Sequence, residues 1–217
     1  MSRLVVVLPL SPLRDGDSFA VQEWPLHITV VPPFLTDAAP AEIAAAIASA
    51  ASAQTALTAV AGQDEMFGRR KDVPVTVVAE NEALTLLHRT LLDAVRPFAA
   101  SPEEPAFTGL EFRPHITFKK HGRVREGDEF SLTQIALVDM APRSAPGGRS
   151  VLATLPLPLR TSTDAAAECR AHGGLRRGRN TQRTPPADEL RGRTSTFPGR
   201  MKVECDPSRG VRGTTGS

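Results

Sequence analysis

The chain has 217 residues and nearly balanced charge, with 26 Lys and Arg against 24 Asp and Glu, and its only two cysteines are Cys169 and Cys205. This composition excludes a C-x-x-C metal or redox site and, for the first 160 residues, a disulfide framework, and no stretch of eighteen apolar residues is present to cross a membrane. Because the N-terminal residues become charged too early for a signal peptide, we expect a soluble, cytoplasmic protein.

Two strands are predicted in the N-terminal part of the chain. An almost wholly apolar, β-branched run from Arg3 to Leu10 predicts a buried strand that ends at the Ser11-Pro12 turn. A second strand, from Leu26 to Val31, alternates apolar and polar residues and is expected to stop at Pro32-Pro33.

The next predicted elements are a helix and two strands. An Ala-rich helix is expected from Ala41 to Ala53, with Thr36 or Asp37 as its cap. Residues 56–60 and 73–79 are predicted strands, and the polar stretch between them favours a hairpin or an exposed loop.

A second helix follows Asn81, which can cap it. Its apolar residues fall at helical spacing on one side, namely Leu84, Leu87, Leu91, Val95 and Phe98. His88 borders this stripe, and we expect it to be a packed structural histidine.

Three further strands are predicted, from about Phe112 to Lys119, from Leu132 to Val138 and from Val151 to Leu155. The order of strands and helices, with short turns between sequential strands, predicts an α+β fold with mostly antiparallel sheets. Each half of this order has one helix and one strand that bears a histidine motif. We therefore expect two similar lobes that face each other.

The last part of the chain differs from the rest in charge and composition. Residues 161–217 carry 11 Lys and Arg against 6 Asp and Glu, a net charge of +5, which leaves −3 for residues 1–160. The segment is rich in Arg, Gly and Pro and has too little apolar surface to offset the entropy of ordering. We therefore divide the chain into a domain, 1–160, and a disordered tail, 161–217, which could tether RNA or serve only as a linker.

One triplet occurs twice in the domain: His27-Ile28-Thr29 within WPLHITVVPPF, and His115-Ile116-Thr117 within FRPHITFKKHG. The chain has only five histidines, so chance is a poor explanation of the repetition. In a strand, His27 and Thr29 share one face while their apolar neighbours share the other, and the same holds for His115 and Thr117. The repetition predicts two half-sites or an internal duplication.

Two such pairs facing one cleft suit phosphoryl chemistry without a metal. A histidine near its ordinary pKa of about 6.5 can give or take a proton at neutral pH, so two histidines can be acid and base together. The threonine hydroxyls can donate to non-bridging phosphate oxygens. A zinc site would need a third ligand and spacings that are missing, and no G-x-S-x-G or Gly-rich phosphate loop is present. A single H-x-T motif is more often only a polar strand face, but the matched pair favours function.

With their apolar flanks, the two motifs resemble the H-x-[ST]-x signatures of the 2H phosphoesterase superfamily, which includes the 2′-5′ RNA ligases and the 2′,3′-cyclic nucleotide phosphodiesterases. The resemblance covers roughly residues 1–160, and the tail has no counterpart in it. It implies a bilobal, pseudo-two-fold α+β fold with the motifs lining a central cleft. It also implies that His27 and His115 are the catalytic acid and base, and that Thr29 and Thr117 bind the substrate phosphate.

Aromatic and basic residues outside the motifs are weaker candidates. Lys119-Lys120-His121, with Arg123 and Arg125, forms the densest basic patch of the domain and could contact phosphate or RNA. The Arg69-Arg70-Lys71 run is more simply a solvated loop. Tyrosine is absent, so a stacked base would need another aromatic residue, namely Trp24, Phe34 or Phe118.

The motifs predict metal-independent phosphoryl chemistry, and the resemblance implies a phosphodiesterase that hydrolyses 2′,3′-cyclic phosphate ends of RNA or cyclic nucleotides, with 2′-5′ RNA ligation as the reverse reaction. We expect no cofactor or metal, an RNA or nucleotide substrate with a cyclic phosphate, no membrane association, and a monomer. The sequence does not distinguish acid from base, and His115 as base with His27 as acid is a first assignment. The alternatives are a phosphodiesterase of cyclic oligonucleotide signals and a non-catalytic RNA- or nucleotide-binding module. The complete motifs argue against a pure binder, because lysine or arginine would bind phosphate better.

Overall fold

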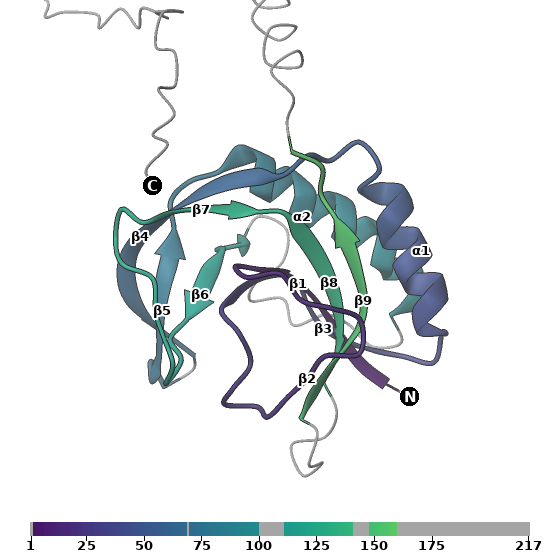
Figure 1. Ribbon diagram of the computed structural model, residues 1–217, viewed down its shortest axis with the longest axis horizontal. Coiled ribbons are helices and arrows are strands. Elements are labelled where there is room, and N and C mark those ends of the chain that lie inside the picture. Colours follow the sequence, from purple (N-terminus) through teal and green to yellow (C-terminus); the bar gives the residue numbers. More distant parts are fainter. Residues whose placement is uncertain (1, 69, 100–110, 141–147, 160–217) are drawn as a thin grey trace, which may run out of the picture. The chain divides into compact units, whose positions relative to one another are not determined.

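The computed structural model describes residues 2–68, 70–99, 111–140 and 148–159 (Figure 1). The predicted tail lies outside these residues, so the division of the chain at residue 160 stays a prediction. In chain order, the described elements are β1 (Ser2–Pro9), β2 (Ser18–Phe19), β3 (His27–Thr36), α1 (Pro40–Ala50), β4 (Leu57–Phe67), β5 (Val73–Val78), α2 (Glu82–Val95), the short 3₁₀ helix η1 (Arg96–Phe98), β6 (His115–Thr117), β7 (Glu129–Leu132), β8 (Gln134–Asp139) and β9 (Arg149–Pro156).

The described strands form one curled sheet in the order β2-β9-β8-β1-β3-β6-β5-β4-β7 (Figure 1). Neighbouring strands pair antiparallel from one edge of the sheet to the other. Together with the two α-helices, this pairing confirms the predicted α+β class. The two motif strands, β3 and β6, are direct neighbours in the middle of the sheet, although α1, β4, β5 and α2 lie between them in sequence.

Both helices cover one face of the sheet. They pack against each other, and α1 also contacts β9 while α2 contacts β3. Their buried residues, such as Ile43 and Ile47 of α1 and Leu84 and Leu91 of α2, join Ile28 of β3 in the main hydrophobic core. Because each fully buried side chain of this size contributes roughly 1.5–3 kcal/mol, this core holds the motif strand firmly in the sheet.

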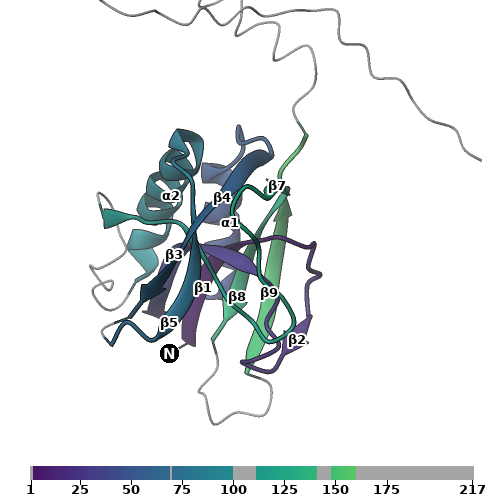
Figure 2. The same ribbon diagram turned by 90° about the vertical axis from the view of Figure 1, so that its left-hand side faces the viewer.

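The opposite face carries a second hydrophobic cluster, at β1, β8 and β9. Here Val5 and Val7 of β1 pack against Leu13 and Trp24, which belong to the segment that joins β1 to β3. Figure 2 shows this segment, with β2, on the side of the strands away from the helices. Val7 pairs directly with Thr29, so the polar residues of the first motif lie on this same face. We call it the site face.

The caps explain where the helices begin. Asn81 caps α2 as predicted, since its side-chain oxygen accepts a hydrogen bond of 3.0 Å from a backbone N–H of the first turn. The prediction for α1 was wrong, because the helix begins at Pro40 and neither Thr36 nor Asp37 is its N-cap residue. Instead, the Glu42 carboxylate reaches back to the backbone N–H of the residue before Pro40, at 3.2 Å.

The first motif strand is longer than predicted. β3 continues through Pro32 and Pro33 to Thr36. Its register with β1 shifts between Val31 and Phe34, and the two prolines fall within this irregularity. A bulged stretch does not need every backbone donor, so the prolines interrupt the ladder without ending the strand.

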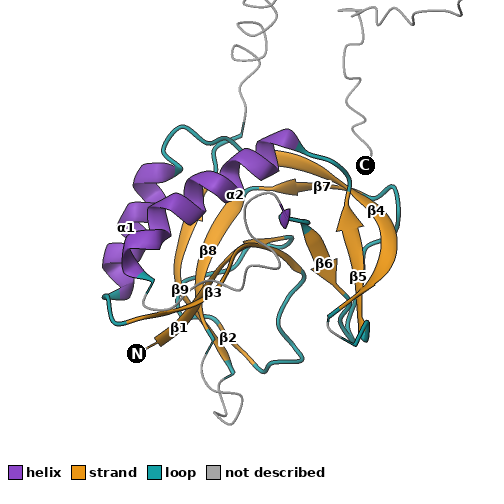
Figure 3. Cartoon of the chain, turned by 180° about the vertical axis from the view of Figure 1, so that it is seen from behind, coloured by secondary structure: helices purple, strands orange, loops and turns teal. Residues whose placement is uncertain are grey.

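The strand predicted from Leu132 to Val138 corresponds to β8, and the strand before it, β7, was not predicted. β7 ends at Leu132 and pairs with β4 at one edge of the sheet, whereas β8 begins at Gln134 and lies between β1 and β9 (Figure 3). Thr133 lies between them, and its carbonyl accepts a hydrogen bond of 2.8 Å from the backbone N–H of Leu157. The break left no clear signal, because a short apolar run does not show where one strand passes into the next.

His88 connects α2 to both motif strands. It is fully buried, and its Nδ1–H donates to the carbonyl of Val30, one residue after Thr29, at 2.6 Å. Its ring also stacks on Phe112, which precedes the second motif, with centroids 3.9 Å apart. The expected packed structural histidine is confirmed, and it helps to fix the two motif strands against one helix.

Candidate active site

The register between β3 and β6 places the two motifs beside each other. Their central isoleucines pair, and both point into the main core. One step along each antiparallel strand then places His27 beside Thr117, and Thr29 beside His115. Because side chains alternate between the faces of a sheet, all four polar side chains lie together on the site face. The structure thus brings together the four residues that the sequence selected.

The two histidines are held by the same kind of hydrogen bond to the backbone. Nδ1 of His27 lies 2.7 Å from the carbonyl oxygen of Pro25, and Nδ1 of His115 lies 2.8 Å from that of Arg113. A carbonyl only accepts, so Nδ1 carries the hydrogen in both rings. The neutral tautomer is therefore fixed with Nε2 as the nitrogen that can accept a proton.

The first half-site comprises His27, Thr29, Trp24, Lys119 and Arg149. The indole of Trp24 stacks on the His27 ring, with centroids 3.9 Å apart and planes inclined by 27°. Lys119 Nζ lies 5.9 Å and Arg149 Cζ 5.6 Å from the Trp24 ring centroid, within the range of cation–π attraction. Trp24 and Arg149 are buried, so His27 occupies a desolvated and cationic environment.

The second half-site comprises His115, Thr117, Phe67, Arg113 and Glu65. Phe67, at the end of β4, contacts the His115 ring with centroids 4.7 Å apart. The Arg113 guanidinium lies 5.0 Å from the Phe67 ring centroid, and its Nη2 donates to Glu65 Oε1 at 2.6 Å. The arginine beside His115 therefore has a carboxylate partner, and the half-site is less cationic than the first.

Burial lowers the pKa of both histidines, but not equally. The pKa of His27 falls to about 4, chiefly through desolvation, with further lowering by the charges of Lys119, His115 and Arg149 and an opposing effect of the Pro25 hydrogen bond. Desolvation also lowers the pKa of His115, and the charge of Arg113 adds to this. Burial and the charge of Arg149 lower the pKa of Lys119. Both imidazoles therefore favour the neutral form.

Four site residues escaped the sequence analysis. The strand β4 was predicted only to Val60, so the contribution of its later residues to the site face was missed. A register shift near Ala61 carries the strand past the predicted end. Arg149 follows a stretch with no strand signal, and Arg113 was passed over as a flanking residue, although its position two residues before the motif histidine was an available clue. The four residues are Glu65, Phe67, Arg113 and Arg149.

The remaining aromatic and basic candidates differ in their surroundings. Phe34 is buried in the main core and offers no face to a base. Trp24 is already stacked on His27, and the Phe118 ring has the Arg123 guanidinium 5.4 Å from its centroid. Arg123 also lies 3.5 Å from Asp64, whereas Lys120, His121 and Arg125 are exposed. Of the other basic run, Arg69 lies outside the described residues, and Arg70 and Lys71 are exposed in the β4–β5 turn.

No group of three or more His, Cys, Asp or Glu residues in the described part of the chain is placed to hold a metal ion. Among the helices of the same residues, none is long and apolar enough to span a membrane.

The model of the 2′-5′ RNA ligase superfamily matches residues 8–137, a range that contains both motifs. The chain belongs to this superfamily. Its members are 2H phosphoesterases, so the resemblance inferred from the two H-x-T triplets is confirmed. Membership of the 2′-5′ RNA ligase superfamily supports an enzyme that acts on phosphate esters.

Several solved structures are similar to the chain. E. coli LigT complexed with 3′-AMP is 18% identical, with a TM-score of 0.45, and the match covers 72% of this chain and 98% of LigT. TT0787 of Thermus thermophilus is 20% identical, with a TM-score of 0.45 and coverage of 73% and 100%. Kluyveromyces marxianus Usb1 is 11% identical, with a TM-score of 0.41 and coverage of 73% and 98%. No curated protein matches the chain. Membership of the superfamily therefore rests on the family match.

Proposed function

We propose that the protein is a metal-independent phosphodiesterase that hydrolyses 2′,3′-cyclic phosphates at RNA ends or in cyclic nucleotides. The observation that carries this proposal is the equivalence of His27 and His115. Each ring is fixed through Nδ1 by the carbonyl two residues earlier, so Nε2 is the nitrogen that can exchange a proton in both rings. One imidazole can then accept a proton while the other donates one, without a metal.

The two threonines complete the proposed phosphate site. Thr117 lies beside His27 and Thr29 beside His115, so each half-site would use a hydroxyl from the other motif. These hydroxyls would donate to the non-bridging oxygens, where negative charge grows during the reaction. In this proposal, the parts of the sheet on either side of the β3–β6 pair act as the two equivalent lobes expected from the resemblance.

The surroundings of the histidines suggest which is acid and which is base. The acid must hold a proton before the reaction, whereas the base must be neutral. Desolvation and nearby cations give His27 the more strongly lowered pKa, so it serves as the base in our proposal. His115 serves as the acid, because its pKa is lowered less, so that a bound phosphate anion, which raises the pKa of both imidazoles, favours protonation of His115 first. This order replaces the first assignment made from the sequence.

The two histidines provide both proton transfers that the proposed reaction needs. Water attacks phosphorus while His27 takes its proton, the bond from phosphorus to one ribose oxygen breaks, and His115 gives its proton to that oxygen. Ligation would follow the same steps with an RNA 5′-hydroxyl in place of water: His27 takes the proton of the hydroxyl as its oxygen bonds to phosphorus, and His115 protonates the ribose oxygen that leaves. Hydrolysis and ligation therefore need the same starting states, a neutral His27 and a protonated His115.

Incubation with a 2′,3′-cyclic mononucleotide in excess EDTA tests the proposal. We expect hydrolysis to a nucleoside monophosphate, measured by chromatography, and loss of product formation in His27→Ala and His115→Ala. Activity that disappears in EDTA and returns with zinc would contradict the metal-free mechanism. Binding without any product would indicate a nucleotide-binding module instead. A cyclic dinucleotide assayed in parallel distinguishes the substrate class of cyclic oligonucleotide signals.

A further inference from the structure

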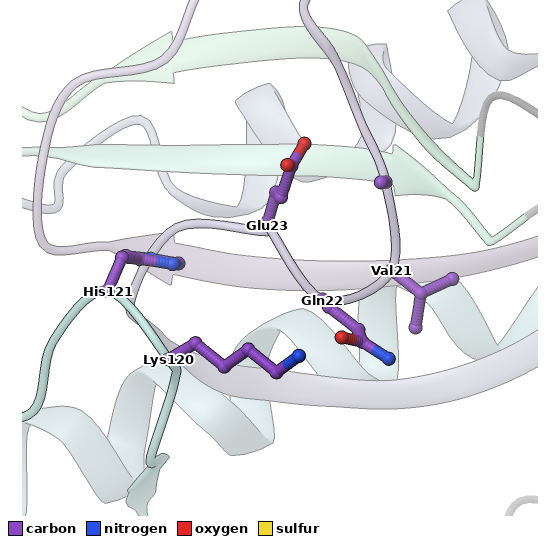
Figure 4. A pocket seen from close by; sticks show the side chains of 6 residues that line it. Val21, Gln22, Glu23, Lys120 and His121 are labelled. Atoms are coloured by element: carbon purple, nitrogen blue, oxygen red, sulfur yellow. The ribbon is translucent and has the colours of Figure 1, made fainter.

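A groove lies between the turn that precedes Trp24 and the turn that follows β6 (Figure 4). Its larger part is a pocket of about 580 Å³ lined by Ala20, Val21, Gln22, Glu23, Lys120 and His121. The smaller part, of about 270 Å³, is lined by Val21, Gln22, Phe118, Lys119 and Lys120. Three residues line both parts, so the two pockets form one continuous feature, which we call the flanking groove.

The flanking groove leads away from the first half-site. Lys119, in the wall of its smaller part, lies over the Trp24 ring that stacks on His27. Gln22 lies only two residues before Trp24 along the same segment. A substrate whose phosphate lies at His27 could therefore continue first into the smaller part and then into the larger part.

The walls of the groove offer the contacts that a nucleotide needs. Val21 and Phe118 provide apolar surface for a base, and the Gln22 amide provides both a donor and an acceptor for its edge. Figure 4 shows the side chains of Lys120 and Gln22 pointing toward each other, while the Glu23 carboxylate points away from them. Lys120 is exposed and can neutralise a phosphate. The larger part also falls within the usual size range of ligand pockets, roughly 300–1,000 Å³.

We propose that the flanking groove binds the nucleotide that precedes the cyclic phosphate end, with Lys120 on the phosphate that joins the last two nucleotides. The inference rests on the proposed function and narrows its substrate to RNA ends, because a cyclic mononucleotide has nothing to place in the larger part. The positive charge of the groove matches the negative charge of an RNA strand.

The test compares kcat/KM for a dinucleotide that ends in a 2′,3′-cyclic phosphate with kcat/KM for the matching cyclic mononucleotide. We expect the kcat/KM of the parent to be at least about tenfold higher for the dinucleotide, because only the dinucleotide makes contacts along the whole groove. Lys120→Gln should remove most of this preference, and Gln22→Ala should reduce it. Arg89→Gln removes the same charge from an exposed position of α2 and should keep the preference unchanged.

The possible outcomes distinguish a failure of the groove proposal from a failure of the proposed function. Equal kcat/KM values for both substrates in the parent, or equal effects of Lys120→Gln and Arg89→Gln on the preference, would overturn the groove proposal and leave the phosphodiesterase intact. If the parent hydrolyses neither substrate, the proposed function fails. The groove is then tested by the affinity for a 3′-phosphorylated dinucleotide. A larger loss of affinity in Lys120→Gln than in Arg89→Gln supports it, and an equal loss overturns it.

Discussion

The two half-sites share one backbone plan but differ in their surroundings. Each has a histidine held through Nδ1, an aromatic ring against the imidazole and at least one cation near that ring. In the first, Lys119 has no acidic partner among the described residues, whereas Arg113 of the second is paired with Glu65 at 2.6 Å. The strand motif therefore fixes the tautomer of both rings, while the residues around it set their different pKa values.

The largest expected effect is common to both half-sites. Removal of a general acid or base typically costs roughly 100- to 10,000-fold in rate. We expect His27→Ala and His115→Ala each to lose activity by that order in kcat/KM for a cyclic phosphate, with unchanged circular dichroism. If one variant keeps the activity of the parent, the two half-sites do not share the chemistry.

The threonines should show a smaller loss, again in both half-sites. Loss of one preorganised donor can cost up to about 100- to 1,000-fold in turnover. Thr29→Val and Thr117→Val keep the branched shape, so kcat should fall while the free energy of unfolding changes by less than about 1 kcal/mol. Parent-like turnover in both variants would mean that other groups hold the phosphate, with Lys119 as the first candidate.

Acid should destabilise the fold chiefly through the first half-site. The unfolded chain binds a proton at each histidine near pH 6.5, whereas folded His27 binds one only near pH 4, so this contribution to stability is present above pH 6.5 and is lost as the pH falls toward 4. The full loss at this one residue amounts to roughly 3–4 kcal/mol. Denaturant unfolding at pH 7 and pH 4.5 should show a smaller acid effect in His27→Gln than in the parent. His115→Gln should reduce the acid effect less, and an equal reduction by both would contradict the asymmetry.

The smallest effect concerns the cations. Removal of a nearby positive charge favours protonation, so Lys119→Met should raise the pKa of His27 and Arg113→Met that of His115. NMR titration of the imidazole carbons measures both values in one sample. Arg89→Gln serves as the charge control. Unchanged pKa values in both variants would show that desolvation alone lowers the pKa of His27 and His115 below that of an exposed histidine.

The local parts of this arrangement could be predicted from the sequence. The stripe of α2, the Asn81 cap and the alternation of the two motif strands depend on near neighbours, and the family resemblance selected the four motif residues. The pairing of β3 with β6 depends on contacts between residues far apart in sequence, so no local pattern showed it. The same reason explains Phe67, which reaches His115 only because β4 continues past a bulge. The break between β7 and β8 at Thr133 likewise depends on the pairing of these strands with partners far away in the sequence.

The dependence of kcat/KM on pH, measured in EDTA with a 2′,3′-cyclic phosphate, tests the central claim most directly. With His27 as base and His115 as acid, the profile of the parent is a bell, and its optimum lies below the ordinary histidine pKa of about 6.5 because both values are lowered. His27→Ala should lose the acidic limb, and His115→Ala the basic limb. The result that contradicts the account is a profile in which either variant keeps both limbs.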